Sequence, residues 1–72
     1  MGSALYEIRV RGRLGAGVSQ SFTGFAASVE DGETILRGTI LDQSELHSVL
    51  EQVEAFGLEL VEVRRLDAPR RP

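Results

Sequence analysis

Residues 25–40 read FAASVEDGETILRGTI, and this stretch predicts a β-hairpin around which the rest of the fold is arranged. Asp31-Gly32 at its centre tolerates the positive φ angles that a tight hairpin turn requires. Polar and apolar residues alternate on both sides, so we expect strands over residues 21–29 and 33–40. The predicted register pairs Val29 with Thr34, Ala27 with Leu36, and Phe25 with Gly38.

The length of this turn has more than one solution. A two-residue loop and a four-residue loop give the same register. Glu30 and Glu33 would repel each other as a closing pair, which favours the four-residue loop. A three-residue bulged loop would shift the register by one residue and is the main alternative. The aromatic ring of Phe25 can cover the gap that Gly38 leaves, which favours the unshifted register.

A helix follows the hairpin, and its start is strongly specified. Asp42 is a good N-cap, Glu45 completes a capping box, and Leu41 with Leu46 can form a hydrophobic staple. Apolar residues then recur at helical spacing and form one stripe: Leu46, Val49, Leu50, Val53 and Phe56. Gly57 is the expected C′ residue that ends the helix.

Two further strands complete the expected fold. Residues 6–14 alternate, with Tyr6, Ile8 and Val10 on one face, and residues 58–66 form the last strand. Residues 15–17, which include two glycines, are expected to be a flexible connection. The order is β-β-β-α-β, a four-stranded, mainly antiparallel sheet in spatial order 4-1-2-3 with one helix on one face, and thus an α+β protein. The last strand should run parallel to the first and third.

Length and composition limit what can stabilise this chain. Its 72 residues make one domain, expected over residues 1–66, with a disordered tail at 67–72. The absence of cysteine excludes disulfides and thiolate zinc sites, and one histidine cannot build a zinc site. We therefore expect no cofactor, and a partner subunit is the stabilising device that remains. No apolar run approaches the roughly 18 residues of a membrane span, so we expect a cytoplasmic protein without membrane contact.

The sheet face without the helix is the expected interaction surface. The core should hold Tyr6, Ile8, Val10, Phe25, Ala27, Val29, Leu36, Ile40 and Val63. The opposite face should then carry Arg9, Arg11, Arg13, Phe22, Ala26, Ile35, Arg37 and Leu60, with Glu62 and Arg64 beside them. Arginine and aromatic residues are enriched in protein interfaces, so self-association ranks first. An ordinary solvent-exposed sheet ranks second.

Nucleic acid or another anion ranks third as a partner for this face. The net charge is −3, lysine is absent, and one exposed phenylalanine is fewer than a base-stacking sheet offers. We therefore expect no nucleic-acid binding.

The catalytic motifs in the chain are incomplete. His47 and Glu51 are four residues apart with Glu54 nearby, a spacing that could bind a metal ion or form a general acid–base pair. No third metal ligand is suggested, and an ordinary exposed helix face has the same pattern. The glycines at 15 and 17 lack the rest of a phosphate-binding loop, and no serine lies in a nucleophile elbow. Glu59 and Glu62 should lie on opposite faces of their strand. We expect no enzymatic activity.

Several elements together resemble a group of small uncharacterised proteins common in actinobacterial genomes. They are residues 6–10 (YEIRV), Phe22-x-Gly24, Leu36-Arg-Gly38, Asp42-Gln43 with Leu46-His47 and Leu50, and Gly57-Leu58 before Val63-Arg64-Arg65. The resemblance spans residues 6–66 and implies a stand-alone cytoplasmic domain with no assigned activity. It carries over no catalytic residue.

These observations lead to two expectations of function. The first is a non-enzymatic module that self-associates, as a dimer before other oligomers, or binds another protein through the sheet face. The alternative is a small-ligand or anion sensor whose pocket forms at a subunit junction or beside residues 15–17.

Overall fold

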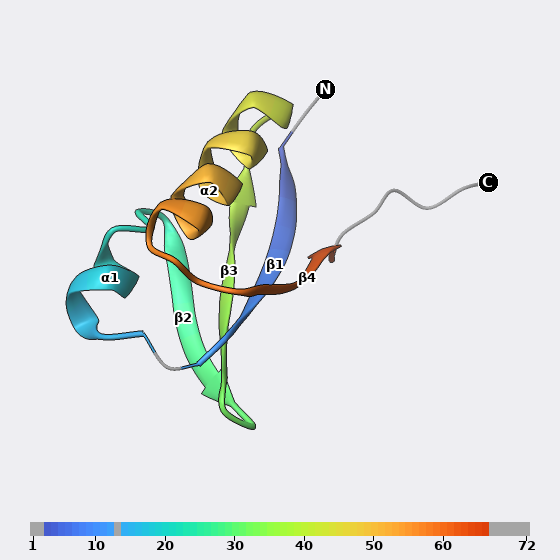
Figure 1. Ribbon diagram of the computed structural model, residues 1–72. Coiled ribbons are helices and arrows are strands. Elements are labelled where there is room, and N and C mark those ends of the chain that lie inside the picture. Colours follow the sequence, from blue (N-terminus) through green and yellow to red (C-terminus); the bar gives the residue numbers. More distant parts are fainter. Residues whose placement is uncertain (1–2, 13, 67–72) are drawn as a thin grey trace.

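The computed structural model describes residues 3–12 and 14–66 (Figure 1). Six elements follow one another: β1 (Ala4–Arg11), α1 (Ala16–Gln20), β2 (Phe25–Glu30), β3 (Glu33–Ile40), α2 (Gln43–Ala55) and β4 (Leu60–Arg65). The expected α+β class is therefore confirmed. The predicted tail at 67–72 and Arg13 lie outside the described residues. Among the described residues, no helix is long and apolar enough to cross a membrane.

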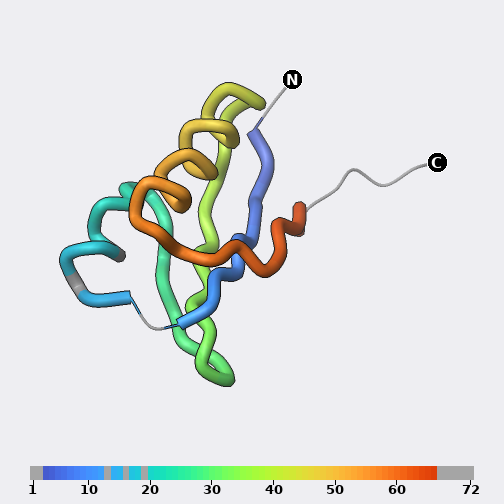
Figure 2. The backbone as a smooth tube through the Cα atoms, in the orientation of Figure 1, coloured from blue at the N-terminus to red at the C-terminus, as the bar shows by residue number. Residues whose placement is uncertain are grey.

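The strands form one sheet in the order β2-β3-β1-β4, and all neighbouring pairs are antiparallel. The predicted order 4-1-2-3 correctly placed β4 beside β1, but β2 and β3 exchange places. The chain does not turn directly from β1 into β2. Figure 2 follows it through α1 to the outer edge of the sheet, which leaves the position beside β1 to β3.

The directions of the strands follow from this order. β4 runs parallel to β3, as predicted, but antiparallel to β1, which corrects the other half of that prediction. β1 and β2 are likewise parallel and separated by β3. The β-α-β-β-α-β order with two split crossovers is the ferredoxin-like arrangement, here with a first helix of only 5 residues. That short helix replaces the expected flexible connection.

The predicted hairpin register is confirmed residue by residue from Phe25↔Gly38 to Val29↔Thr34. The predicted four-residue loop is wrong, because Glu30 pairs with Glu33 and only Asp31 and Gly32 remain in the turn. Both turn residues have positive φ, 52° and 78°, as a two-residue hairpin turn requires. The repulsion that argued against this loop is relieved by Arg9 of β1, described below.

The predicted N-cap and C′ residues of α2 are confirmed, and the Glu45 side chain of the predicted capping box accepts from the Leu41 N–H rather than from Asp42. The Asp42 side chain accepts a hydrogen bond of 2.9 Å from the Glu45 N–H, so it caps the first turn. At the other end Gly57 has φ 73°, and the Leu58 N–H donates to the Val53 carbonyl at 3.1 Å. This bond is the outer hydrogen bond of a Schellman motif, for which a glycine at C′ is favoured. Local sequence alone accounts for the length of the helix.

The core lies between α2 and the sheet. Its buried members are Ile8, Val10, Phe22, Leu36, Ile40, Val49 and Val53, with Tyr6, Leu14, Val18, Phe25, Leu46, Leu58 and Val63 packed around them. Two predicted core residues are absent from it, since Ala27 is exposed and Val29 is 49% exposed. Figure 1 shows the reason, because the hairpin end of β2 and β3 extends beyond α2.

Phe22 is the largest correction to the predicted faces. It was assigned to the uncovered side of the sheet, but it is 3% exposed and its ring lies 5.9 Å from that of Phe56. Residues 21–24 form a turn rather than the first part of β2, so the strand alternation does not reach Phe22. The Gln52 side-chain amide donates to the Ser21 carbonyl at 2.9 Å and links this turn to α2.

Candidate functional site

The face of the sheet opposite α2, called here the open face, carries charged residues from all four strands. They alternate with the core residues along each strand, as the pleat requires. Glu7, Arg9 and Arg11 come from β1, Glu30 from β2, Glu33 and Arg37 from β3, and Glu62 and Arg64 from β4. The uncharged residues Leu5 of β1, Ala26 and Ser28 of β2, and Ile35 and Thr39 of β3 lie on the same face.

Glu7 is the centre of the open face. Its side chain is only 4% exposed, and it lies directly opposite Arg37 on one neighbouring strand and Arg64 on the other. The Arg37 Nε donates to its Oε1 at 3.0 Å, while Arg9 and Arg64 approach its Oε2 at 3.4 and 3.8 Å. Three guanidinium groups therefore compensate the negative charge of this buried carboxylate.

Arg9 extends from β1 across β3 to the end of the hairpin. Its Nη1 lies 3.3 Å from a Glu33 carboxylate oxygen and 3.7 Å from one of Glu30, which explains how these two glutamates tolerate being a closing pair. Ile35, directly opposite Arg9, is 1% exposed. Ile35 therefore lies on the predicted face but offers almost no surface to a partner.

A β-bulge in β4 changes which residues reach the open face. The register shifts between Arg9 and Val10, so Glu62 pairs with Arg9 while Leu60 pairs with Val10. Val10 is a core residue, and directly opposed residues share a face, so Leu60 is not on the open face as predicted.

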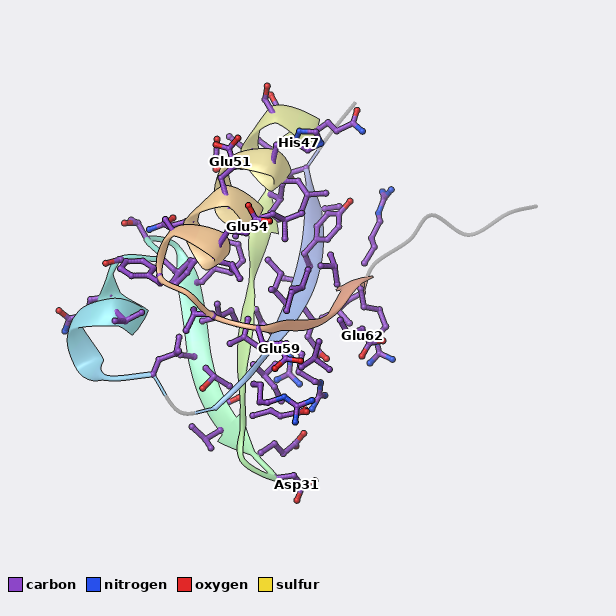
Figure 3. The ribbon with its side chains drawn as sticks, in the orientation of Figure 1. Asp31, His47, Glu51, Glu54, Glu59 and Glu62 are labelled. Atoms are coloured by element: carbon purple, nitrogen blue, oxygen red, sulfur yellow. The ribbon has the colours of Figure 1, made fainter. Side chains whose placement is uncertain are left out.

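The same shift overturns the expectation that Glu59 and Glu62 lie on opposite faces. Glu59 reaches Arg11 at 3.1 Å, and Glu62 lies 4.0 Å from Arg9 (Figure 3). Both carboxylates therefore join the arginines of the open face. The extra residue of a bulge is a common way to re-aim a side chain.

The charges of the open face neutralise one another. Its ion pairs join four arginines (Arg9, Arg11, Arg37 and Arg64) to five glutamates (Glu7, Glu30, Glu33, Glu59 and Glu62) within the described residues. The sequence analysis expected arginines with few acids. Because the glutamates already occupy the guanidinium groups, the open face has no excess positive charge for an anion.

The ion pairs of Glu7 predict a loss of stability in acid. The hydrogen bond from Arg37 holds the pKa of Glu7 below its ordinary value of 4.5; desolvation opposes this, and the charges of Arg37, Arg64 and Arg9 support it. A lowered native pKa means that the unfolded chain binds the proton more tightly. This contribution to stability is present above pH 4.5 and disappears as the pH falls through the native pKa.

We therefore expect the Tm of the Glu7→Gln variant to fall less than that of the wild type between about pH 6 and about pH 3. Thermal unfolding followed by circular dichroism measures this. Glu51→Gln on the exposed side of α2 is the matched control and should keep the wild-type pH profile. Equal acid sensitivity of Glu7→Gln and the wild type would contradict this role of Glu7.

His47 lies on the outer side of α2, where Glu51 and Glu54 are its neighbours (Figure 3). With Leu50 these residues line an open hollow of about 240 Å³. Within residues 3–12 and 14–66, no group of three or more His, Cys, Asp or Glu side chains is placed to hold a metal ion.

A second hollow lies where β1, β3 and β4 meet the start of α2. It has a volume of about 260 Å³ and is lined by Ala4, Tyr6, Ile40, Leu41, Asp42, Gln43, Leu46 and Arg65. Tyr6 and Arg65 are directly opposite each other on β1 and β4. The hollow therefore combines apolar walls with a phenol, a guanidinium and the polar first turn of a helix.

The two edges of the sheet differ. β4 carries a bulge and ends in Arg64 and Arg65, features that protect an edge against pairing. β2 has a regular register, no charged residue from Phe25 to Val29, and five exposed residues among its six. In the part of the chain that the structure describes, only β3 pairs with β2. Sequence reasoning missed this edge because the predicted strand order placed residues 21–29 inside the sheet.

A family model described as "Domain of unknown function (DUF8691)" matches residues 5–64. No curated protein and no solved structure matches the chain. The matched range contains all of α1, β2, β3 and α2 and most of β1 and β4. This chain is therefore a member of the DUF8691 family.

Proposed function

We propose that this domain is a non-enzymatic binding module that self-associates, forming a homodimer in the cytoplasm. The observation that carries the proposal is the β2 edge, an exposed strand without charged residues between Phe25 and Val29. An edge strand of this kind presents unpaired N–H and C=O groups, which a second strand can satisfy. The basic residues of the chain are all arginines, and lysine is absent. We also infer an actinobacterial origin, which this composition fits.

The centre of the open face is less suited to the contact than its edge. A partner covering that centre would have to remove water from ion pairs that are already formed within one chain, and such desolvation offsets most of the gain. Ile35 is covered, and Phe22 lies in the core. Other than Ala26, the surviving predicted interface residues are arginines (Arg9, Arg11 and Arg37), each ion-paired within the chain.

The size of the chain supports association as well. A domain of about 60 residues buries only roughly 60% of the surface that its unfolded chain exposes, so its own core provides a small margin of stability. Val29, Leu60 and Val61 are each between 40% and 49% exposed at the sheet edges. Of these three, Val29 lies on the β2 edge, and covering it in a dimer would add apolar burial that one chain cannot achieve.

Sedimentation equilibrium from low to high micromolar concentration tests the proposal. We expect the average mass to rise from that of the 7.9 kDa chain toward twice that value, and the Tm to rise with protein concentration. A constant mass of one chain over the whole range, with a Tm independent of concentration, would overturn self-association.

The second candidate function is the sensing of a small ligand, and the hollow at the start of α2 supports it. Arg65 and Tyr6 could recognise a carboxylate or phosphate group there, beside the apolar walls of Ile40 and Leu46. A thermal-shift screen against amino acids, nucleotides and polyanions tests this, because a ligand of the native state raises the Tm. An Arg65→Ala variant should lose the shift. A salt-sensitive response to polyanions alone would instead favour nucleic acid.

A further inference from the structure

The backbone groups on the outer side of β2 can be assigned from the hairpin. The residues that close a two-residue turn, Glu30 and Glu33, form a hydrogen-bonded pair, and such pairs alternate along an antiparallel ladder. Ser28 and Ala26 therefore direct their N–H and C=O groups toward β3. The groups of Ala27 and Val29 point outward, away from the sheet.

The start of β2 agrees with this assignment. The Phe25 N–H donates to the carbonyl of Phe22 at 3.1 Å, as expected for an N–H that does not point toward β3. The Phe25 carbonyl remains on the outer side together with the groups of Ala27 and Val29. These groups are spaced at every second residue, the pattern that an added antiparallel strand requires.

We propose that β2 pairs antiparallel with β2 of a second copy, centred on Ala27, so that two sheets join into one sheet of eight strands. This inference rests on the proposed self-association and specifies its surface and register. A two-fold axis perpendicular to the sheet keeps each face continuous. Directly opposed residues must point to the same face of the joined sheet. This condition is met only if one residue of β2 lies directly opposite the same residue of the second copy, with the axis between them.

Centring the pair on Ala27 gives complementary side chains. On the helix side, Phe25 lies opposite Val29 of the second copy, and aromatic with β-branched residues is a favourable cross-strand pair. On the open face, Ala26 lies opposite Ser28 of the second copy, and two small residues allow close approach. Glu30 falls opposite Gly24, so no like charges meet.

The neighbouring register, centred on Ser28, is poorer. It places Ala26 opposite Glu30 of the second copy and moves Phe25 beyond the other strand. The exposed side of Val29 would then meet only Ala27. In the Ala27 register each Ala27 N–H donates to the Ala27 carbonyl of the second copy, and each Val29 N–H donates to a Phe25 carbonyl. This register pairs every outward group of residues 25–29 except the Val29 carbonyl, because the Phe25 N–H opposite it already donates to the Phe22 carbonyl.

Single cysteine variants test this register, because the chain has no cysteine of its own. In a pair centred on Ala27 the two Cα atoms of that residue are about 5.5 Å apart, within the range of a disulfide. The two Ser28 Cα atoms are then roughly 8 Å apart, beyond the limit of about 7 Å. Under mild oxidation we expect Ala27→Cys to form covalent dimers at least about tenfold faster than Ser28→Cys.

The outcomes separate the two proposals. Faster cross-linking of Ser28→Cys would overturn the Ala27 register. Slow cross-linking of both variants, in a chain that dimerises in the ultracentrifuge, would overturn pairing through β2 and leave self-association standing. A chain that is monomeric at every concentration would remove both.

A proline at position 27 tests the hydrogen bonds. Proline is tolerated on an edge strand where the lost N–H points outward, so Ala27→Pro should fold and keep the wild-type circular dichroism spectrum. We expect its dimer dissociation constant to rise about tenfold or more. Val29→Lys, at a half-exposed position, is the second variant and should weaken the dimer in the same way. A folded variant of either kind with unchanged self-association would overturn the proposal.

Discussion

Replacing Phe22 by alanine is expected to lower the free energy of unfolding by about 3–5 kcal/mol. Phe22 is 3% exposed within the core cluster, and its ring packs against that of Phe56 with the centroids 5.9 Å apart. A 72-residue domain has roughly 4–11 kcal/mol of stability in total. The variant should therefore lose a large part of this stability, and a wild type at the lower end of the range would leave it unfolded at room temperature. Urea denaturation followed by circular dichroism measures the loss.

Phe56→Ala is the matched comparison, because it removes the other ring of the same contact. Phe56 is 41% exposed, so part of its side chain is in water already and the loss should be clearly smaller than for Phe22. A decrease of less than about 1 kcal/mol in the free energy of unfolding of Phe22→Ala would mean that Phe22 lies at the surface, where strand alternation alone places it.

Adding one methyl group at Gly38 is expected to cost about 3 kcal/mol, at the upper end of the range for overpacking. A Cβ atom there would lie 2.7 Å from the Gly24 carbonyl oxygen and 2.8 Å from Cδ2 of Phe25. A ring can rotate, but the oxygen belongs to the turn that positions β2, so the strand itself would have to move. Urea denaturation of Gly38→Ala measures the loss.

Gly15→Ala is the control for this substitution. A Cβ at Gly15 meets nothing within 4 Å, so the same chemical change should alter stability by no more than about 0.5 kcal/mol. Equal effects of the two substitutions would mean that the ring of Phe25 does not cover Gly38. The predicted register of the hairpin, which pairs these two residues, would then be in doubt.

The features that were predictable from the sequence depend on residues close together in the chain. The Asp31-Gly32 turn, the pairing of Phe25 with Gly38, and the Asp42 cap of α2 each involve groups that a short segment brings together. Turn and cap preferences are properties of the local backbone, and they act before any distant strand is in place. Even the alternation of β1 correctly separated its core side from its charged side.

The open face was predictable only in part, for a physical reason. Arg9 reaches Glu30 and Glu33 only because β3 lies beside β1, and the sequence offers β2 as an equally plausible neighbour. Of the three arginines around Glu7, Arg37 is brought there by the same long-range pairing, whereas Arg64 comes from β4 and Arg9 from β1 itself. An ion pair across strands depends on which strands are adjacent, and that choice rests on the packing of the whole core.

The sequence by itself therefore determined the α+β class, the hairpin and its register, and the helix with both of its ends. Tertiary structure alone decided the exchange of β2 and β3, the burial of Phe22, the bulge that turns Glu59 toward Arg11, and the exposure of the β2 edge. Local features follow from the conformational preferences of a few adjacent residues. The others follow from the arrangement that buries the most apolar surface while pairing every charge that is withdrawn from water, and no single segment carries that information.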